Sequence, residues 1–384
     1  NLDEYFMIRI SGMKSQIELG LTIPDKKTGY MPKEYLDKML KKSQKLVSSQ
    51  YEIYDERIKE LNQHFKFTSY QKLTHKQQIK MDNYFINLVF PILTPIRFSQ
   101  HLPFPLLPNL SVYLMCKLVD SNNQEQYSVV TVPKNVERVV QVKKETYVLL
   151  EDIIENNIDT LYDGFTVKEI VPFRITRDFD IAFDNQSDDF ASAVMNKLKN
   201  RKRGDAVRLE IATHASDEII NFLSNNLKLS KKYIFKINGP IDLTFLNEVY
   251  DLLKIEKKGL AFEDIKPITP ISFPNNHSLF DVIRKKDVLL FHPFHSYDTV
   301  INLLKEASLD PDVVAIKQTI YRTNKDSQIM EHLIRAAESG KQVTVLFELR
   351  ARFDEENNLH LGHILERVGA HVIYGVPTLK THSK

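Results

Sequence analysis

A histidine and several arginines near the end of the chain are the residues best suited to chemistry. His382 lies in LKTHSK, Arg322 follows the run VVAIKQTIY, and Arg350 and Arg352 follow VTVLFEL. A neutral histidine can act as a nucleophile, and an arginine stays charged and binds phosphate oxygens through two N–H groups at once. These residue types predict a site for an anionic substrate, most simply phosphate, with His382 placed to attack it.

Lys384 stands two residues after His382. In an extended segment, side chains at i and i+2 point to the same side, so this lysine can neutralise a phosphoryl group on the histidine. A surface histidine beside a lysine gives the same spacing by chance. For any one arginine the alternative is an ion pair with Asp354, Glu355 or Glu356. The convergence of several arginines with His382 favours the anion site.

Four apolar, β-rich runs are expected to position these residues. They read DVLLFHPF, VVAIKQTIY, VTVLFEL and HVIYGV, and amphipathic helical patterns separate them. A βαβαβαβ order predicts a largely parallel sheet, whose ligands bind beyond the C-terminal ends of the strands. The first strand is expected at about 288–291. His292 and His295 would follow it, and we assign them to supporting contacts or packing.

The rest of the chain divides into a helical segment, 1–65, and a mixed segment, 66–268, ahead of the α/β segment at 269–384. The first segment is expected to hold two amphipathic helices, the second with a lysine-rich face that we interpret as solvated. A helix at about 75–88, a proline-rich connector, short strands and further helices follow. The predicted fold class is multidomain α and α/β.

One further helix is expected over DDFASAVMNKLKN, and the basic turn of Arg201, Lys202 and Arg203 follows it. We interpret this turn as solvated, with phosphate contact as the alternative. The 384 residues, 42% hydrophobic and 27% charged, are typical of a globular protein of two or three domains.

Several classes of protein are excluded by composition. The single Cys116 rules out an internal disulfide and suits a reducing cytoplasm. The net charge of +2 gives no general affinity for nucleic acid. No C-x-x-C, H-E-x-x-H, P-loop or G-x-G-x-x-G occurs, so neither a zinc site nor an ordinary nucleotide-binding loop is expected. The first residues, NLDEYFMIRI, lack the features of a signal peptide and do not begin with an initiator Met. The sequence is therefore expected to be a fragment.

In several sequence motifs the chain resembles the polyphosphate kinase family of the long, phosphohistidine type. The matching motifs are distributed along the whole chain: NLDEYFMIRISGM, PILTPI, RGDAVRLE, DVLLFHPFHSYD, AIKQTIYRTNKDS, ELRARFDEENN and LKTHSK. The resemblance implies reversible transfer of the terminal phosphate of ATP to inorganic polyphosphate through a phosphohistidine. It implies four domains: an N-terminal helical domain, an α+β head domain and two phospholipase D-like domains. This chain would hold part of the first, the head, and a truncated third.

The resemblance also implies roles for individual residues. His382 corresponds to the phosphorylated histidine, and Asn1 to an asparagine that contacts the adenine of ATP. Arg322 and Arg352 fall at the family's magnesium and phosphate site. Because guanidinium is a poor metal ligand, we interpret both as contacts to the phosphate oxygens that carry Mg²⁺.

Arg350 and Lys384 are further candidates for phosphate contact. The expected partners are ATP, ADP and polyphosphate, with a homo-oligomer formed through the head domain and no nucleic acid. The expected location is the cytoplasm, and association with the inner face of the membrane stays open. Because the family continues beyond Lys384, this fragment alone is expected to be inactive or nearly so.

Two other functions remain as alternatives. A phospholipase D-like phosphodiesterase also uses H-x-K and a phosphohistidine, but it would need a second H-x-K and no ATP site. A non-catalytic polyanion-binding or dimer-forming module would keep its binding when His382 is replaced by alanine.

Overall fold

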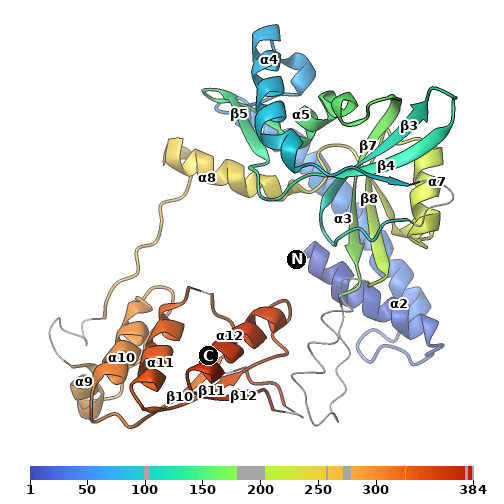
Figure 1. Ribbon diagram of the computed structural model, residues 1–384. Helices are drawn as coiled ribbons and strands as arrows, with labels where there is room; N and C mark the ends of the chain where they lie inside the picture. The colour runs from blue at the N-terminus through green and yellow to red at the C-terminus, as the bar shows by residue number, and fades with distance from the viewer. Residues whose placement is uncertain are drawn as a thin grey trace. The chain divides into compact units, whose positions relative to one another are not determined.

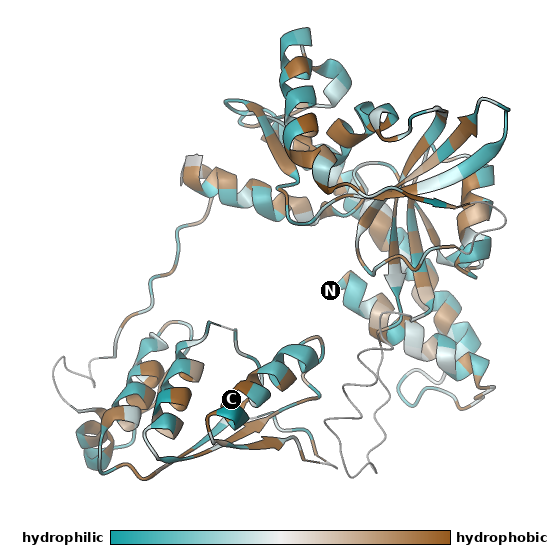
Figure 2. Cartoon of the chain, in the orientation of Figure 1, coloured by the Kyte–Doolittle hydropathy of each residue, from teal (hydrophilic) through white to brown (hydrophobic). Residues whose placement is uncertain are grey.

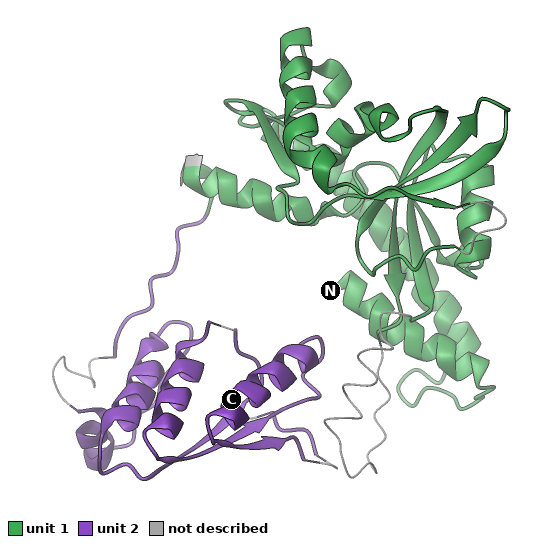
Figure 3. Ribbon diagram, in the orientation of Figure 1, with its two compact units in different colours: residues 1–180, 201–261 green, residues 181–200, 262–384 purple. Residues whose placement is uncertain are grey.

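The computed structural model describes residues 1–98, 104–179, 204–256, 258–270, 278–324, 326–376 and 379–382. The chain forms two compact units, shown in Figure 3. The first unit comprises residues 1–180 and 201–261, and the second comprises 181–200 and 262–384. The predicted helix at DDFASAVMNKLKN and the basic turn at 201–203 lie outside the described residues.

The first unit begins with helices, as the apolar spacing predicts. They are α1 (Leu2–Glu4), a π-helical stretch (Tyr5–Ile10), α2 (Ser11–Glu18) and α3 (Pro32–Leu61). Pro32 is the first residue of α3, where its fixed φ favours the helix and its missing N–H costs nothing. The buried face of α3 includes Leu36, Leu40 and Val47, and the lysines of the other face are exposed, as expected.

A six-stranded sheet in the order β2-β4-β3-β7-β8-β9 follows the helices (Figure 1). Its strands are β2 (Ile96–Phe98), β3 (Val112–Asp120), β4 (Glu125–Thr131), β7 (Phe165–Arg177), β8 (Ala206–Ala212) and β9 (Ile234–Ile237). Only β8 and β9 pair in parallel; the other pairs are antiparallel. Phe6 and Leu36 from the helices share one hydrophobic core with Leu114 and Phe173 of the sheet.

A second, small sheet and several helices complete the first unit. The sheet has the order β1-β6-β5. Its strands are β1 (Lys66–Phe67), β5 (Val139–Lys143) and β6 (Thr146–Leu149), and the helices are α4 (His75–Tyr84), α5 (Leu150–Asn156), α7 (Asp217–Asn226) and α8 (Leu246–Glu256). The side-chain oxygen of Ser216 accepts the N–H of Ile219 and so caps α7.

The second unit is built on a parallel sheet in the order β10-β11-β12. Its elements are α9 (Leu279–Lys285), α10 (Asp298–Leu309), β10 (Ala315–Ile320), α11 (Gln328–Glu338), β11 (Gln342–Phe347), α12 (Glu355–Arg367) and β12 (His371–Tyr374). The helices show hydrophobic stripes beside hydrophilic ones in Figure 2, as amphipathic helices do. Strand, helix and strand alternate here as the sequence predicts.

The first of the four predicted strands is wrong. Residues 287–291 have no regular secondary structure, and Leu289 and Phe291 are 89% and 65% exposed. An apolar run becomes a strand only where a neighbouring strand pairs with it, and the isolated bridge seen here joins Ile268 to His295, the residue after the run. The Nδ1 of His292 lies 2.9 Å from the carbonyl oxygen of His295, so these histidines are tied to their own loop.

None of the helices in the described part of the chain combines the length and the apolar character needed to span a bilayer.

Candidate functional site

The last residues of β10, β11 and β12 lie in register at one edge of the sheet. Ile320 pairs with Phe347, and Phe347 pairs with Tyr374. The residues that follow each strand therefore leave the sheet side by side. This is the edge at which open α/β sheets bind ligands, and it is where the sequence predicts the anion site.

His382 packs against the residue that follows β10. Its ring lies edge-on to the Tyr321 ring, with 5.1 Å between centroids and 84° between planes. The Cζ of Arg322 is 5.5 Å from the centroid of the same ring. The structure thus brings His382 and Arg322, two of the predicted site residues, around one aromatic side chain.

Lys380 also lies at this ring, with its Nζ 5.4 Å from the Tyr321 centroid. The sequence reasoning did not single it out, although K-x-H puts a lysine on the same side of an extended segment as His382, just as H-x-K does. Lys384 lies outside the described residues. Lys380 is therefore the lysine that the described structure places beside the histidine.

Arg322 is exposed and holds the loop that follows β11. Its Nε is 2.5 Å from Oδ2 of Asp354, and its Nη2 donates to the carbonyl oxygen of Arg352 at 2.8 Å. The ion pair considered as the alternative is therefore present for this arginine. A guanidinium has five N–H groups, so these two bonds leave further donors with which to bind an anion.

The loop that carries Arg350 and Arg352 is a series of turns. Leu349 and Ala351 are fully buried within it, whereas Arg350 is half-buried and Arg352 is exposed. The backbone N–H of Arg350 donates to Oε1 of Glu348 at 2.7 Å. Arg352 therefore presents its charge to solvent at the same edge as Arg322.

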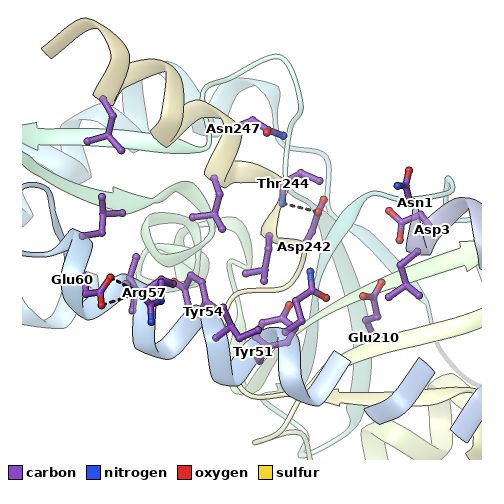
Figure 4. Close-up of a pocket in the computed structure, with 18 of the residues that line it drawn as sticks. Asn1, Asp3, Tyr51, Tyr54, Arg57, Glu60, Glu210, Asp242, Thr244 and Asn247 are labelled. Atoms are coloured by element: carbon purple, nitrogen blue, oxygen red, sulfur yellow. Dashed lines mark hydrogen bonds and ion pairs between the residues drawn. The ribbon is translucent and has the colours of Figure 1, made fainter. Parts of the chain in front are cut away.

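Asn1 belongs to the first unit, where it lines a cavity of about 970 Å³ together with Tyr51, Tyr54 and Asp242 (Figure 4). Its neighbour Asp3 is held by two buried arginines. The Asp3 carboxylate accepts two bonds from Arg174, at 3.0 and 2.7 Å, and a further bond from Arg208.

These two arginines are fixed in turn by other groups. Arg208 donates from Nε and Nη2 to Oγ1 of Thr176, at 3.0 and 2.9 Å. Arg174 and Arg208 each lie 3.1 Å from Oε2 of Glu210. Burial raises the pKa of Asp3, but the hydrogen bond and charge of Arg174, with Arg208, outweigh burial and lower it to about 2. The network therefore fixes the start of α1, which Asn1 directly precedes.

Replacing Asp3 by asparagine is expected to destabilise the first unit by about 2 kcal/mol at pH 7, since each unit of pKa shift corresponds to about 1.4 kcal/mol. The folded pKa lies below the unfolded value of 3.8. The contribution of the ionised Asp3 carboxylate to the free energy of unfolding is therefore complete above about pH 5 and is lost as the pH falls toward 2. Urea unfolding of both proteins between pH 7 and pH 3 measures it.

The control is Glu56→Gln, because Glu56 is an exposed acid paired with Arg57 on the helix α3. It is expected to change the free energy of unfolding by less than about 0.5 kcal/mol. A difference between wild type and Asp3→Asn that stays constant down to pH 3 would contradict the assigned pKa.

In the predicted magnesium and phosphate site, Mg²⁺ is carried by phosphate oxygens and not by the two arginines. Arginine side chains donate hydrogen bonds and do not ligate cations, so Arg322 and Arg352 do not fit as direct ligands. In the part of the chain that the structure describes, no three His, Cys, Asp or Glu side chains cluster as a metal site. Contact of Arg322 and Arg352 with phosphate oxygens stays a prediction.

Family models match the chain in three consecutive stretches. The polyphosphate kinase N-terminal domain matches residues 1–67, the polyphosphate kinase middle domain 76–249, and the polyphosphate kinase C-terminal domain 1 residues 278–384. Together they follow the chain from its first residue to its last.

Curated relatives agree with these matches. A polyphosphate kinase from Halalkalibacterium halodurans is 40% identical over 394 residues, which is 100% of this chain and 56% of the relative. One from Exiguobacterium sp. is 40% identical over 100% of the chain and 54% of the relative, and one from Staphylococcus haemolyticus is 38% identical over the same shares. The chain thus spans just over half the length of the relatives it matches.

A solved structure has the same fold. The crystal structure of polyphosphate kinase from Porphyromonas gingivalis superposes with a TM-score of 0.75 at 22% identity, over 100% of this chain and 55% of that chain. At this identity the likeness concerns the fold alone. The predicted fold class, multidomain α and α/β with a helical N-terminal region, is confirmed.

Proposed function

The chain belongs to the polyphosphate kinase family, and from this premise we propose that the full-length protein transfers the terminal phosphate of ATP reversibly to inorganic polyphosphate. The transfer passes through a phosphohistidine at His382. The observation that supports this most is the meeting of His382, Lys380 and Arg322 around Tyr321 at the strand edge. A nucleophile and two cations at one exposed edge suit a chain of phosphates.

The reaction proceeds in two displacements. A lone pair on one ring nitrogen of neutral His382 attacks the γ-phosphorus of ATP, the bond to the β,γ-bridging oxygen breaks, and ADP leaves with the electron pair. A terminal oxygen of polyphosphate then attacks the phosphohistidine, the P–N bond breaks, and the histidine is regenerated. The polymer grows by one phosphate for each ADP released.

The protein contributes charge and position. Arg322, Arg352 and, in a lesser role, Arg350 and Lys384 bind the oxygens that carry negative charge during transfer. Magnesium enters this scheme only as the ion that ATP carries on its own phosphates. Asn1 contacts the adenine, since an amide can donate to and accept from a base edge.

The surroundings of the site are also part of this proposal. The segments 1–65, 66–268 and 269–384 are part of the helical domain, the head domain and part of the first C-terminal domain of a longer cytoplasmic enzyme. The head domain joins copies of the chain. Its exposed apolar side chains include Ile86, Leu88, Phe90, Ile92 and Ile96.

Light scattering of the full-length protein and a Leu88→Glu variant tests the assembly: a variant with unchanged mass would contradict this surface.

The nature of the product tests the main proposal. Full-length protein is incubated with polyphosphate primer and with ATP labelled at either the γ or the α phosphorus. Only γ-label is expected to enter acid-insoluble polymer, because only the terminal phosphate is transferred. A phosphodiesterase would cleave a phosphodiester substrate and incorporate neither label. Retention of polyphosphate without turnover would favour the binding module and overturn the kinase proposal.

A further inference from the structure

Glu348 is a buried carboxylate at the end of β11. It is the residue directly after the strand, and it is only 1% exposed. Its Oε1 accepts the N–H of Arg350 at 2.7 Å, and its Oε2 accepts the N–H of Thr381 at 2.5 Å. A charge removed from water costs free energy unless hydrogen bonds replace the lost hydration. Both carboxylate oxygens therefore hold backbone N–H groups in place.

The bond to Thr381 fastens the segment that carries the proposed nucleophile. Thr381 directly precedes His382 and is 33 residues from Glu348 in sequence. The segment follows β12, and the N–H of Leu379 donates to the carbonyl oxygen of Val376 at 3.2 Å. Leu379 is 66% exposed, so its side chain adds little hydrophobic packing to this segment. A hydrogen bond to a buried acceptor is accordingly important for its position.

A buried asparagine ties the same frame to the Tyr321 side of the site. Asn358 is fully buried, and its Nδ2 donates to the carbonyl oxygen of Tyr321 at 2.9 Å and to that of Glu348 at 3.1 Å. Tyr321 carries the ring against which His382 packs. The ends of β10 and β11 and the histidine segment are thus joined by a connected set of hydrogen bonds.

We propose that Glu348 is a positioning residue, which sets the location of His382 by holding the backbone N–H of Thr381 at the strand edge. This inference rests on the proposed role of His382 as nucleophile. Because the two carboxylate oxygens bond to backbone N–H groups, Glu348 acts through the segment and not on the phosphate. Displacement of a reacting group by about 1 Å can cost about a hundredfold in rate.

A pair of substitutions at Thr381 isolates the bond. Thr381→Pro removes the N–H that Glu348 accepts, whereas Thr381→Ala removes the side chain and keeps the N–H. In the full-length protein, the rate constant for labelling from γ-labelled ATP is expected to fall by about 10- to 100-fold in the proline variant. The ATP concentration for half-maximal rate should stay within about twofold. The alanine variant should remain near wild type in both.

A second pair of substitutions changes the acceptor. Glu348→Gln replaces one oxygen by an NH₂ group that cannot accept a hydrogen bond, and Glu331→Gln makes the same change on an exposed acid of α11. Hydrogen exchange, followed by mass spectrometry, is expected to be faster in peptides covering 376–382 in Glu348→Gln only. This readout does not depend on activity. Because Thr381 is in an exposed segment, its variants decide the question if Glu348→Gln does not fold.

The outcomes separate this inference from the proposed function. Equal labelling rates in Thr381→Pro and Thr381→Ala would overturn the positioning role, as would unchanged exchange at 376–382 in folded Glu348→Gln. Faster exchange there, together with slower labelling in Thr381→Pro, supports it. If His382→Ala is labelled as fully as wild type, the proposed function fails and the role of Glu348 in positioning a nucleophile fails with it, while the exchange data still report the tether.

Discussion

Replacement of His382 by alanine is expected to reduce acid-labile labelling of the full-length protein from γ-labelled ATP by more than about a thousandfold. The reason is that Lys380 and Arg322, which share the Tyr321 ring with His382, are cations and cannot supply the ring nitrogen that the proposed attack needs. The measurement is the label that survives alkali but not acid, since phosphohistidine is acid-labile.

The matched control is His371→Ala. His371 is an exposed histidine of the same unit at the first residue of β12, opposite Thr344, near the other end of the strands. It should keep full labelling. Acid-labile label that persists in His382→Ala would move the nucleophile elsewhere, and polyphosphate binding without label in either protein would favour the binding module.

Much of the α/β unit could be predicted from sequence. The runs VVAIKQTIY, VTVLFEL and HVIYGV became β10, β11 and β12, because each run has a parallel neighbour and an amphipathic helix beside it. With the strands in place, the meeting of Arg322 and His382 at one edge followed from topology. The run DVLLFHPF failed because apolar character alone does not supply a pairing partner.

The contacts that organise the site could not be predicted. Glu348 and Asn358 look in sequence like any polar residues of a loop and a helix start, and only the fold shows that both are buried. The Asp3 network joins residues 171 and 205 positions apart in the chain. No local sequence pattern marks residues so far apart in the chain as partners.

Removal of the Arg322 charge is expected to slow phosphoryl transfer about a hundredfold more than removal of the ion pair that Arg322 forms in the absence of substrate. Arg322→Ala should lower the labelling rate of the full-length protein by about that factor, because charge stabilisation during transfer commonly contributes this much. The labelling rate of Arg322→Lys should lie between those of wild type and Arg322→Ala, because lysine keeps the charge but lacks the planar guanidinium that binds two oxygens at once.

Asp354→Asn supplies the comparison that separates the two interpretations of Arg322. The Nε–Oδ2 distance of 2.5 Å shows that the pair is formed. If the arginine served only that pair, removal of either partner would slow labelling by the same factor. If Arg322 binds phosphate oxygens, Asp354→Asn frees the guanidinium and leaves the rate within about threefold of wild type, while Arg322→Ala abolishes the contact. Equal losses would therefore refute a phosphate-binding role for Arg322 and leave it as a structural tie between the loops after β10 and β11.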